Sequence, residues 1–156
     1  AHLDADVKVP AGETRAFSFT NLGGAANWNN YVVVLRNAAL AEYVVVRSDN
    51  YGWTGDNSGP YGWKNCTAGS TGAADWATWL AGMNGAKVVV YVTNNNNGTA
   101  DVLAITTGTD GKVNTQYYYG IDGVVANDLF VDFTVDSSCL KFDTAASARK
   151  YSARRR

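Results

Sequence analysis

The chain has 156 residues, the length of one ordinary domain, and 46% of them are apolar, enough to bury a core. Charged residues make up only 17%, so the polar surface has to come mainly from Asn, Thr, Ser, Gly and Tyr, which suits neutral, hydroxyl-rich ligands. Five of the 13 basic residues lie in the last eight positions, which leaves 8 basic and 14 acidic residues, a net of −6, in the rest of the chain. An acidic body repels phosphate backbones, so nucleic-acid binding by the folded part is not expected.

The predicted strands follow from period-two alternation and β-branched runs. The pattern predicts about eight of them: Thr14–Thr20, Tyr31–Arg36, Tyr43–Arg47, Lys87–Thr93, Thr99–Thr107, Val113–Gly120, Leu129–Val135 and Cys139–Phe142. The second and third form a predicted hairpin, Asn94–Gly98 a hairpin loop, and Asp110-Gly111 a turn.

One short helix is predicted around residues 75–83, because Trp76, Trp79, Leu80 and Met83 recur at helical spacing, with Gly82 and Gly85 ending it. We expect Trp76 and Trp79 to pack in the core. Many strands with short turns predict an all-β fold, a two-layer antiparallel β-sandwich of the jelly-roll type. Residues 1–148 are predicted to form this single domain, and the basic residues 149–156 a disordered tail or a linker.

The residues that most enzymes need are scarce. The one histidine is His2, which argues against a Ser-His-Asp or Cys-His arrangement and against a histidine metal site. The two glutamates, Glu13 and Glu42, do not suggest the facing carboxylates of a glycosidase, and aspartates such as Asp49 and Asp101 are more typical of turns. No glycine pattern fits a phosphate loop, so we expect no catalysis by this domain.

The first residue and the two cysteines bear on whether the protein is exported. No apolar run approaches the roughly 20 residues of a membrane span. The chain begins at Ala1 as a mature protein or an excised domain would. The two cysteines, Cys66 and Cys139, are either free thiols or a disulfide, and the disulfide would fit an exported protein.

Residues 48–74 are rich in turn formers and aromatics, which is typical of a functional loop. Tyr51-Gly52-Trp53 and Tyr61-Gly62-Trp63 place large rings among polar residues, where either the domain or a ligand has to cover them. The apolar C–H face of a sugar stacks on such rings, and nearby side chains such as Asp49 and Asn50 can bind its hydroxyls. Trp28 either plugs an end of the sandwich or projects as a further platform.

A second group of candidate ligand-binding residues lies on predicted strands. In Gln116-Tyr117-Tyr118-Tyr119, we expect Gln116 and Tyr118 on the exposed face, with the opposite register as the alternative. Arg47 ends a strand and either contacts the ligand or is solvated.

The segments Asn27–Leu35, Glu42–Trp53, Ala74–Leu80, Asn84–Val88 and Gly108–Gly111 resemble those of β-sandwich carbohydrate-binding modules attached to bacterial polysaccharide-degrading enzymes. The resemblance covers most of residues 14–143. It implies a secreted, non-catalytic module that is covalently linked to a glycoside hydrolase or lyase. Many such modules carry a structural calcium, for which Asp4, Asp6, Glu13 and Asp136 are the candidate ligands, but linear sequence does not show six to eight oxygens converging, so no cofactor is predicted.

The sequence therefore predicts non-catalytic binding of a neutral polysaccharide, a plant-type β-glucan or hemicellulose, through stacking on exposed Trp and Tyr side chains. This binding would target an attached enzyme to its substrate. The alternatives are a structural or adhesive sandwich of a surface protein, in which the aromatic rings are buried, and a small jelly-roll glycosidase or lyase.

Overall fold

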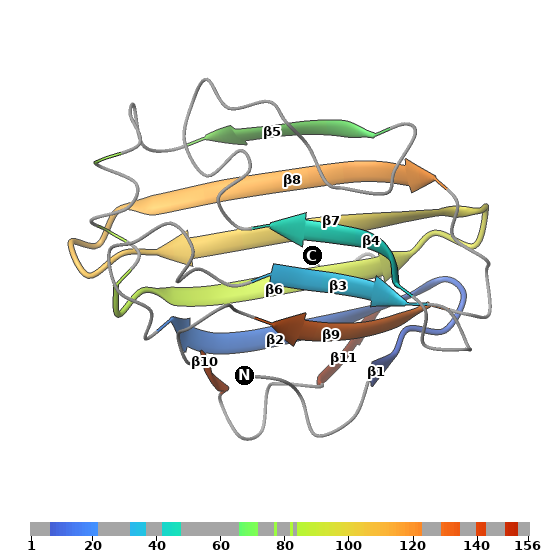
Figure 1. Ribbon diagram of the computed structural model, residues 1–156, viewed down its shortest axis with the longest axis horizontal. Coiled ribbons are helices and arrows are strands. Elements are labelled where there is room, and N and C mark those ends of the chain that lie inside the picture. The colour runs from blue at the N-terminus through green and yellow to red at the C-terminus, as the bar shows by residue number, and fades with distance from the viewer. Residues whose placement is uncertain are drawn as a thin grey trace.

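The computed structural model of the chain contains two antiparallel β-sheets (Figure 1). It describes residues 7–21, 32–36, 42–47, 66–71, 77, 82, 84–122, 129–134, 140–142 and 149–152. Within this part of the chain, eleven strands are present: β1 Val7–Lys8, β2 Glu13–Asn21, β3 Val32–Arg36, β4 Glu42–Arg47, β5 Thr67–Thr71, β6 Lys87–Asn94, β7 Thr99–Thr107, β8 Val113–Asp122, β9 Phe130–Thr134, β10 Leu140–Phe142 and β11 Arg149–Ser152.

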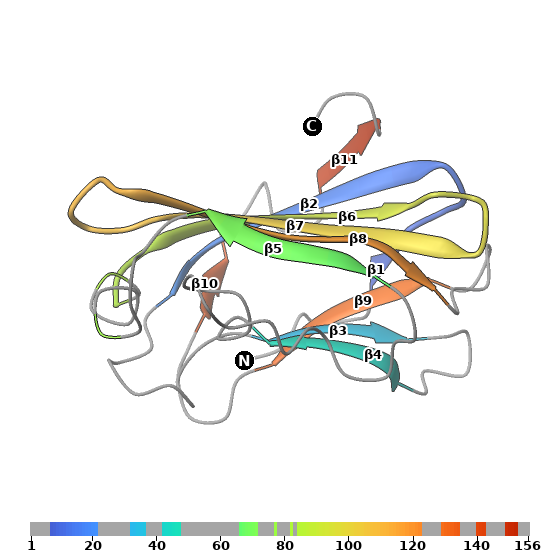
Figure 2. The same ribbon diagram turned by 90° about the horizontal axis from the view of Figure 1, so that it is seen from above.

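The two sheets lie face to face as the layers of a β-sandwich (Figure 2). The small sheet has the strand order β1-β9-β3-β4, and the large sheet has the order β10-β2-β6-β7-β8-β5, with β11 also paired to β2. Every strand pairing among the described residues is antiparallel. The predicted all-β sandwich is therefore confirmed at this level.

The centre of the large sheet is a meander, β6-β7-β8, built from the strands that the sequence indicates most clearly. The Asn94–Gly98 segment joins β6 to β7 as predicted, with φ angles of 59° at Asn96 and 83° at Gly98, backbone conformations that Asn and Gly tolerate best. The predicted Asp110-Gly111 turn joins β7 to β8, where the Asp110 carboxylate accepts the Lys112 N–H at 3.0 Å.

The core fills the space between the sheets with alternate residues of each strand. Phe17 and Phe19 of β2 contribute the aromatic rings from that strand, and Val33 and Leu35 of β3 join the same cluster from the small sheet. The remaining members are Val9, Val88, Val90, Val92, Ala100, Val102, Ala104, Tyr118, Ile121, Leu129 and Val131. This burial of β-branched and aromatic side chains is the main driving force for the fold.

Three strands were missed because their sequences lack apolar alternation. β1 has two residues, and β5, Thr67–Thr71, lies inside the segment that we expected to be an irregular loop. β5 consists of small and polar residues, and it becomes a strand through its pairing with β8 along the edge of the large sheet.

The third missed strand is β11, which corrects the predicted boundary after residue 148. Its residues, Arg149–Ser152, pair with Glu13–Ala16 of β2, so the first half of the predicted disordered tail belongs to the large sheet. Cross-strand pairing with β2 outweighs the local charge of Arg149 and Lys150.

Of the predicted helix, the structure describes Ala77 and Gly82, and both are helical. Gly85 follows with a φ of 81° and donates its N–H to the Asn21 carbonyl at 2.8 Å, which agrees with its predicted role at the helix end. Among the described residues, no helix has the length and apolarity that a membrane crossing requires.

Candidate functional site

The candidate site lies on the outer face of the large sheet, the face turned away from the small sheet (Figure 2). On β8, Tyr117 and Tyr119 point to this face, and Tyr119 is one of the exposed large hydrophobic side chains of the described residues, with 38% of its surface accessible. The other face of β8 carries Asn114, Gln116 and Tyr118, all of which are buried.

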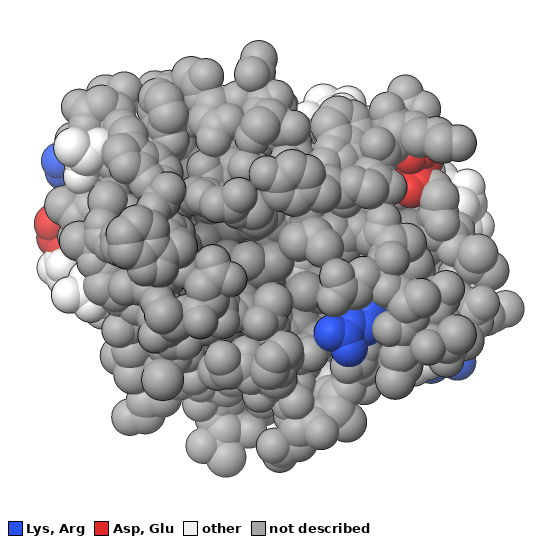
Figure 3. Space-filling view, viewed as in Figure 1, with Lys and Arg blue, Asp and Glu red and all other residues white. Residues whose placement is uncertain are grey.

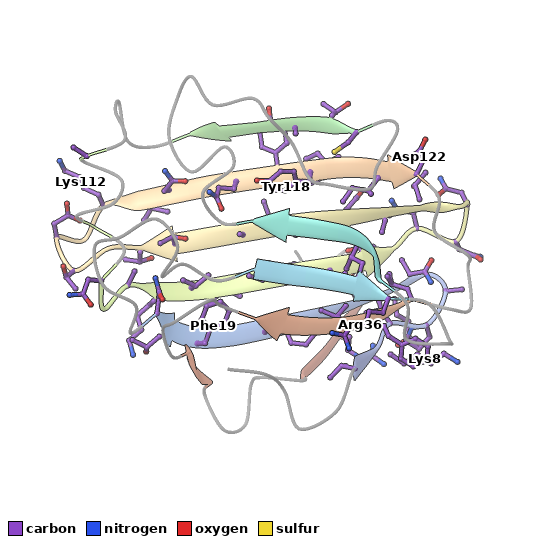
Figure 4. All side chains as sticks on the ribbon, viewed as in Figure 1. Lys8, Phe19, Arg36, Lys112, Tyr118 and Asp122 are labelled. Atoms are coloured by element: carbon purple, nitrogen blue, oxygen red, sulfur yellow. The ribbon has the colours of Figure 1, made fainter. Side chains whose placement is uncertain are left out.

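This register corrects our expectation for β8. Gln116 and Tyr118 are 2% and 1% exposed, so they face the core instead of solvent. Tyr118 packs there as the largest fully buried side chain of the described residues, in the middle of β8, with Lys112 just before the strand and Asp122 at its end (Figure 4). The opposite register, which the sequence left open, is the one in the structure.

Tyr117 and Tyr119 form an aromatic pair, which we call the tyrosine platform. Their ring centroids are 5.1 Å apart and their planes differ by 24°, so the two rings stack. Tyr117 is half-buried, while Tyr119 leaves more of its ring accessible. A stacked pair holds each ring in place, so less side-chain entropy is lost when a ligand binds.

Gly69 of β5 makes room for this platform. It pairs with Tyr117 across the two strands, and a Cβ atom at Gly69 would lie 2.6 Å from the Tyr117 hydroxyl and 2.9 Å from its Cζ. The Tyr117 ring therefore leans across the backbone of β5 at a position where any other residue would displace it.

A β-bulge sets the position of Tyr119. The register between β7 and β8 shifts between Ala100 and Val102, and Gly120 adopts a φ of 70° there. The Asp101 carboxylate accepts the Gly120 N–H at 2.9 Å and the Asn95 side-chain amide at 2.9 Å. The first hydrogen bond holds the backbone directly after Tyr119, and the second orients the Asp101 carboxylate that accepts it.

The platform continues across the sheet as a row of large side chains. Tyr117 pairs with Leu103 of β7, and Leu103 pairs with Tyr91 of β6, so the three side chains lie next to one another on the outer face. All three are half-buried.

On the opposite side of the molecule, shown in Figure 3, the charged side chains of the described residues form separate small spots without a broad patch of either sign.

Cys66 lies beside the platform and is partly buried, and like Ala68 it packs against the core cluster. Among the described residues Cys66 has no disulfide partner, and because Cys139 lies outside them, the disulfide alternative stays a prediction. Burial raises the pKa of the Cys66 thiol from its usual 9.0 to about 11, and the carboxylates of Asp101 and Asp122 add to this, whereas a hydrogen bond with the Tyr119 backbone lowers it.

Most of the sequence-predicted site residues lie outside the described residues: Trp28, Asp49, Asn50, Tyr51, Trp53, Tyr61 and Trp63. The backbone of Arg47 is described as the end of β4, where it pairs with Val32 in the small sheet. The structure therefore does not bring Arg47 into the tyrosine platform of the large sheet.

No cluster of three or more His, Cys, Asp or Glu side chains that could hold a metal occurs in the described part of the chain. Of the candidate calcium ligands, Glu13 is described, and its carboxylate is paired with Arg15 at 3.0 Å. Asp4, Asp6 and Asp136 lie outside the described residues.

Sequence reasoning placed the wrong pair of β8 side chains on the surface and so missed Tyr117 and Tyr119. No signal in the sequence marks this arrangement, because the apolar Val113 is exposed while the polar Asn114 and Gln116 are buried. Searches with this chain match no protein-family model, no curated protein and no solved structure.

Proposed function

We propose that this chain is a non-catalytic carbohydrate-binding domain that holds a neutral polysaccharide on the outer face of its large sheet. The observation that carries the proposal is the tyrosine platform, a stacked pair with Tyr119 exposed on the outer face of the sheet. A sugar ring presents an apolar C–H face that packs against the π face of a tyrosine.

The chemistry around the platform favours a neutral, hydroxyl-rich ligand. The outer-face residues of β5 and β8 next to the tyrosines include Thr67 and Thr115, whose hydroxyls can both donate and accept hydrogen bonds. No charged residue belongs to β5, and charged residues make up only 17% of the chain. A plant-type β-glucan or hemicellulose therefore fits better than a uronate.

The loop aromatics predicted from the sequence form a second part of the proposal. Trp53 and Trp63 would add stacking positions to those of the tyrosine platform, and several weakly binding rings together hold a chain better than one. The resemblance to modules of polysaccharide-degrading enzymes supports secretion and a covalently linked catalytic domain. The chain crosses from one sheet to the other between consecutive strands, for example from β1 to β2 and from β8 to β9. These crossings support the proposed jelly-roll topology.

The test is affinity electrophoresis through gels that contain β-glucan, xyloglucan, glucomannan, xylan, pectin or alginate. We expect retardation by a neutral polymer, loss of most of it in Tyr119→Ala, and normal migration with pectin and alginate. Val113→Ala is the matched control, because Val113 is also exposed on the outer face of β8 but lies at the far end of the strand.

Each outcome has a distinct meaning. Retardation that Tyr119→Ala leaves intact and Trp53→Ala abolishes would move the site from the platform to the loops. Normal migration in every gel would contradict carbohydrate binding and favour the structural or adhesive alternative. Release of reducing ends from any of the polymers would contradict the non-catalytic assignment.

A further inference from the structure

Three exposed Asn or Asp residues followed by glycine lie in described turns: Asn84-Gly85, Asn97-Gly98 and Asp110-Gly111. In such a pair, the glycine backbone nitrogen can attack the preceding side-chain carbonyl carbon and close a five-membered succinimide ring. Glycine has no side chain to obstruct this approach. Whether the ring closes depends on whether the nitrogen is free to attack.

Two of the three pairs have this nitrogen engaged. The Gly85 N–H donates to the Asn21 carbonyl at 2.8 Å, and the Gly111 N–H donates to the Gly108 carbonyl at 2.9 Å. Attack by either nitrogen requires that hydrogen bond to break first, which adds to the barrier.

Asn97-Gly98 differs from both. Within the described part of the chain, the Gly98 N–H has no hydrogen-bond acceptor, although the neighbouring Asn95 and Thr99 are bonded to each other across the loop. The side chain of Asn97 is exposed, at the tip of the β6–β7 hairpin.

The electrophile at Asn97 is also polarised. Its Oδ1 accepts the Thr99 N–H at 3.1 Å and the Thr99 hydroxyl at 2.6 Å. Attack on Cγ transfers negative charge to Oδ1, and two donors already directed at that oxygen stabilise the charge as it develops.

We infer that Asn97 is a site of spontaneous deamidation, with the Gly98 nitrogen as nucleophile and water as the second reactant. The Gly98 N–Cγ bond forms, the Cγ–Nδ2 bond breaks, and the side-chain nitrogen leaves as ammonia together with the proton from the Gly98 amide. Water then opens the succinimide to give aspartate or isoaspartate at position 97. No electron is transferred, and the hairpin tip acquires one negative charge.

The experiment incubates the folded protein in warm, mildly alkaline buffer and follows each Asn-Gly peptide by mass spectrometry, with isoaspartyl methyltransferase as a second readout. We expect conversion at Asn97 to be about tenfold faster than at Asn84, the factor that corresponds to a typical backbone hydrogen bond. In urea-unfolded protein, where neither nitrogen is engaged, the two rates should become equal.

The variant Asn97→Gln is the matched control, because it keeps the amide but lengthens the side chain, and it should abolish isoaspartate at this position. Thr99→Ser keeps both donors and should leave the rate unchanged, whereas Thr99→Val should slow it. Equal rates at Asn84 and Asn97 in the folded protein, or faster conversion at Asn84, would overturn the inference.

Discussion

Gly69 shows how a single small residue can be selected by a neighbour's side chain. Its φ is not in the left-handed region, so the backbone itself does not require glycine. A strand interior normally favours a β-branched residue over glycine. The reason for glycine is the Tyr117 ring, which occupies the space that a Cβ would take.

Gly69→Ala should therefore separate binding from stability. Alanine restricts the unfolded chain, which stabilises the fold by about 0.4–1 kcal/mol, but its methyl group displaces the Tyr117 ring. We expect an unchanged or slightly raised denaturation midpoint together with weaker retardation in the polysaccharide gel. Gly82→Ala makes the same change where a Cβ meets nothing within 4 Å, and it should leave binding intact. Undiminished binding in Gly69→Ala would exclude the Tyr117 position from the site.

Cys66 offers a second residue-scale test through its reactivity. With the thiol pKa raised to about 11, chiefly by burial, little thiolate exists at neutral pH, and alkylation should be slow. In a Cys139→Ser background, we expect the rate at which iodoacetamide alkylates Cys66 in the folded protein to rise most steeply near pH 11 and not near pH 9.0. The raised pKa of Cys66 also makes the stability of the fold depend on pH. The contribution of this thiol to the free energy of unfolding is fully present below pH 9.0 and is lost as the pH rises through about 11. A midpoint near 9.0 would contradict the buried position of this thiol.

At the scale of the element, β8 carries opposite functions on its two faces. Its even-numbered residues up to Tyr118 complete the core, and its odd-numbered residues up to Tyr119 form the outer surface. The bulge at Gly120 then resets the alternation, so that Ile121 is buried although its number is odd.

Two neighbouring substitutions test this assignment. Tyr118→Ala removes a fully buried ring and should lower the free energy of unfolding by about 3–5 kcal/mol. Tyr119→Ala removes a partly exposed ring and should lower it by no more than about 1 kcal/mol while weakening polysaccharide binding. Urea denaturation of both variants provides the measurement, and a larger loss for Tyr119→Ala would mean that the register is reversed.

The same strand shows what the sequence could and could not predict. The bounds of β7 and the start of β8 followed from alternation and from the Asp110-Gly111 turn. Which face of β8 is buried could not be predicted in this way, because tyrosines occupy both of its faces and a tyrosine suits a core as well as a surface. β5 and β11 have no apolar pattern of their own and exist through their partners, information that a local reading does not contain.

At the scale of the whole molecule, one strand ties the beginning of the chain to its end. β2 pairs with β6 along one edge, and its other edge is filled by β10 at Phe19–Asn21 and by β11 at Glu13–Ala16. The aromatic core side chains Phe17 and Phe19 belong to this strand. The stability of the sandwich therefore depends on residues that come last in the sequence.

A chain that ends after residue 138 should test this dependence. It lacks β10 and β11, which leaves the backbone hydrogen-bonding groups on that edge of β2 without partners. We expect a lower urea midpoint and concentration-dependent association by light scattering. Replacing Arg154, Arg155 and Arg156 by Ser keeps both strands and should change neither property. A monomeric truncated chain with an unchanged midpoint would show that the two strands contribute nothing to the large sheet.

The late pairing of β2 also has a kinetic consequence. Contacts between residues far apart in the sequence close long loops, whose entropy has to be overcome before the contacts form, so folding slows as contact order rises. While the chain is being synthesised, β2 can pair with β6, but its second edge stays open until the residues of β10 and β11 have left the ribosome. Folding of this domain should thus finish only after residue 152 has left the ribosome, and until then the open edge of β2 is the surface most prone to pair with another chain.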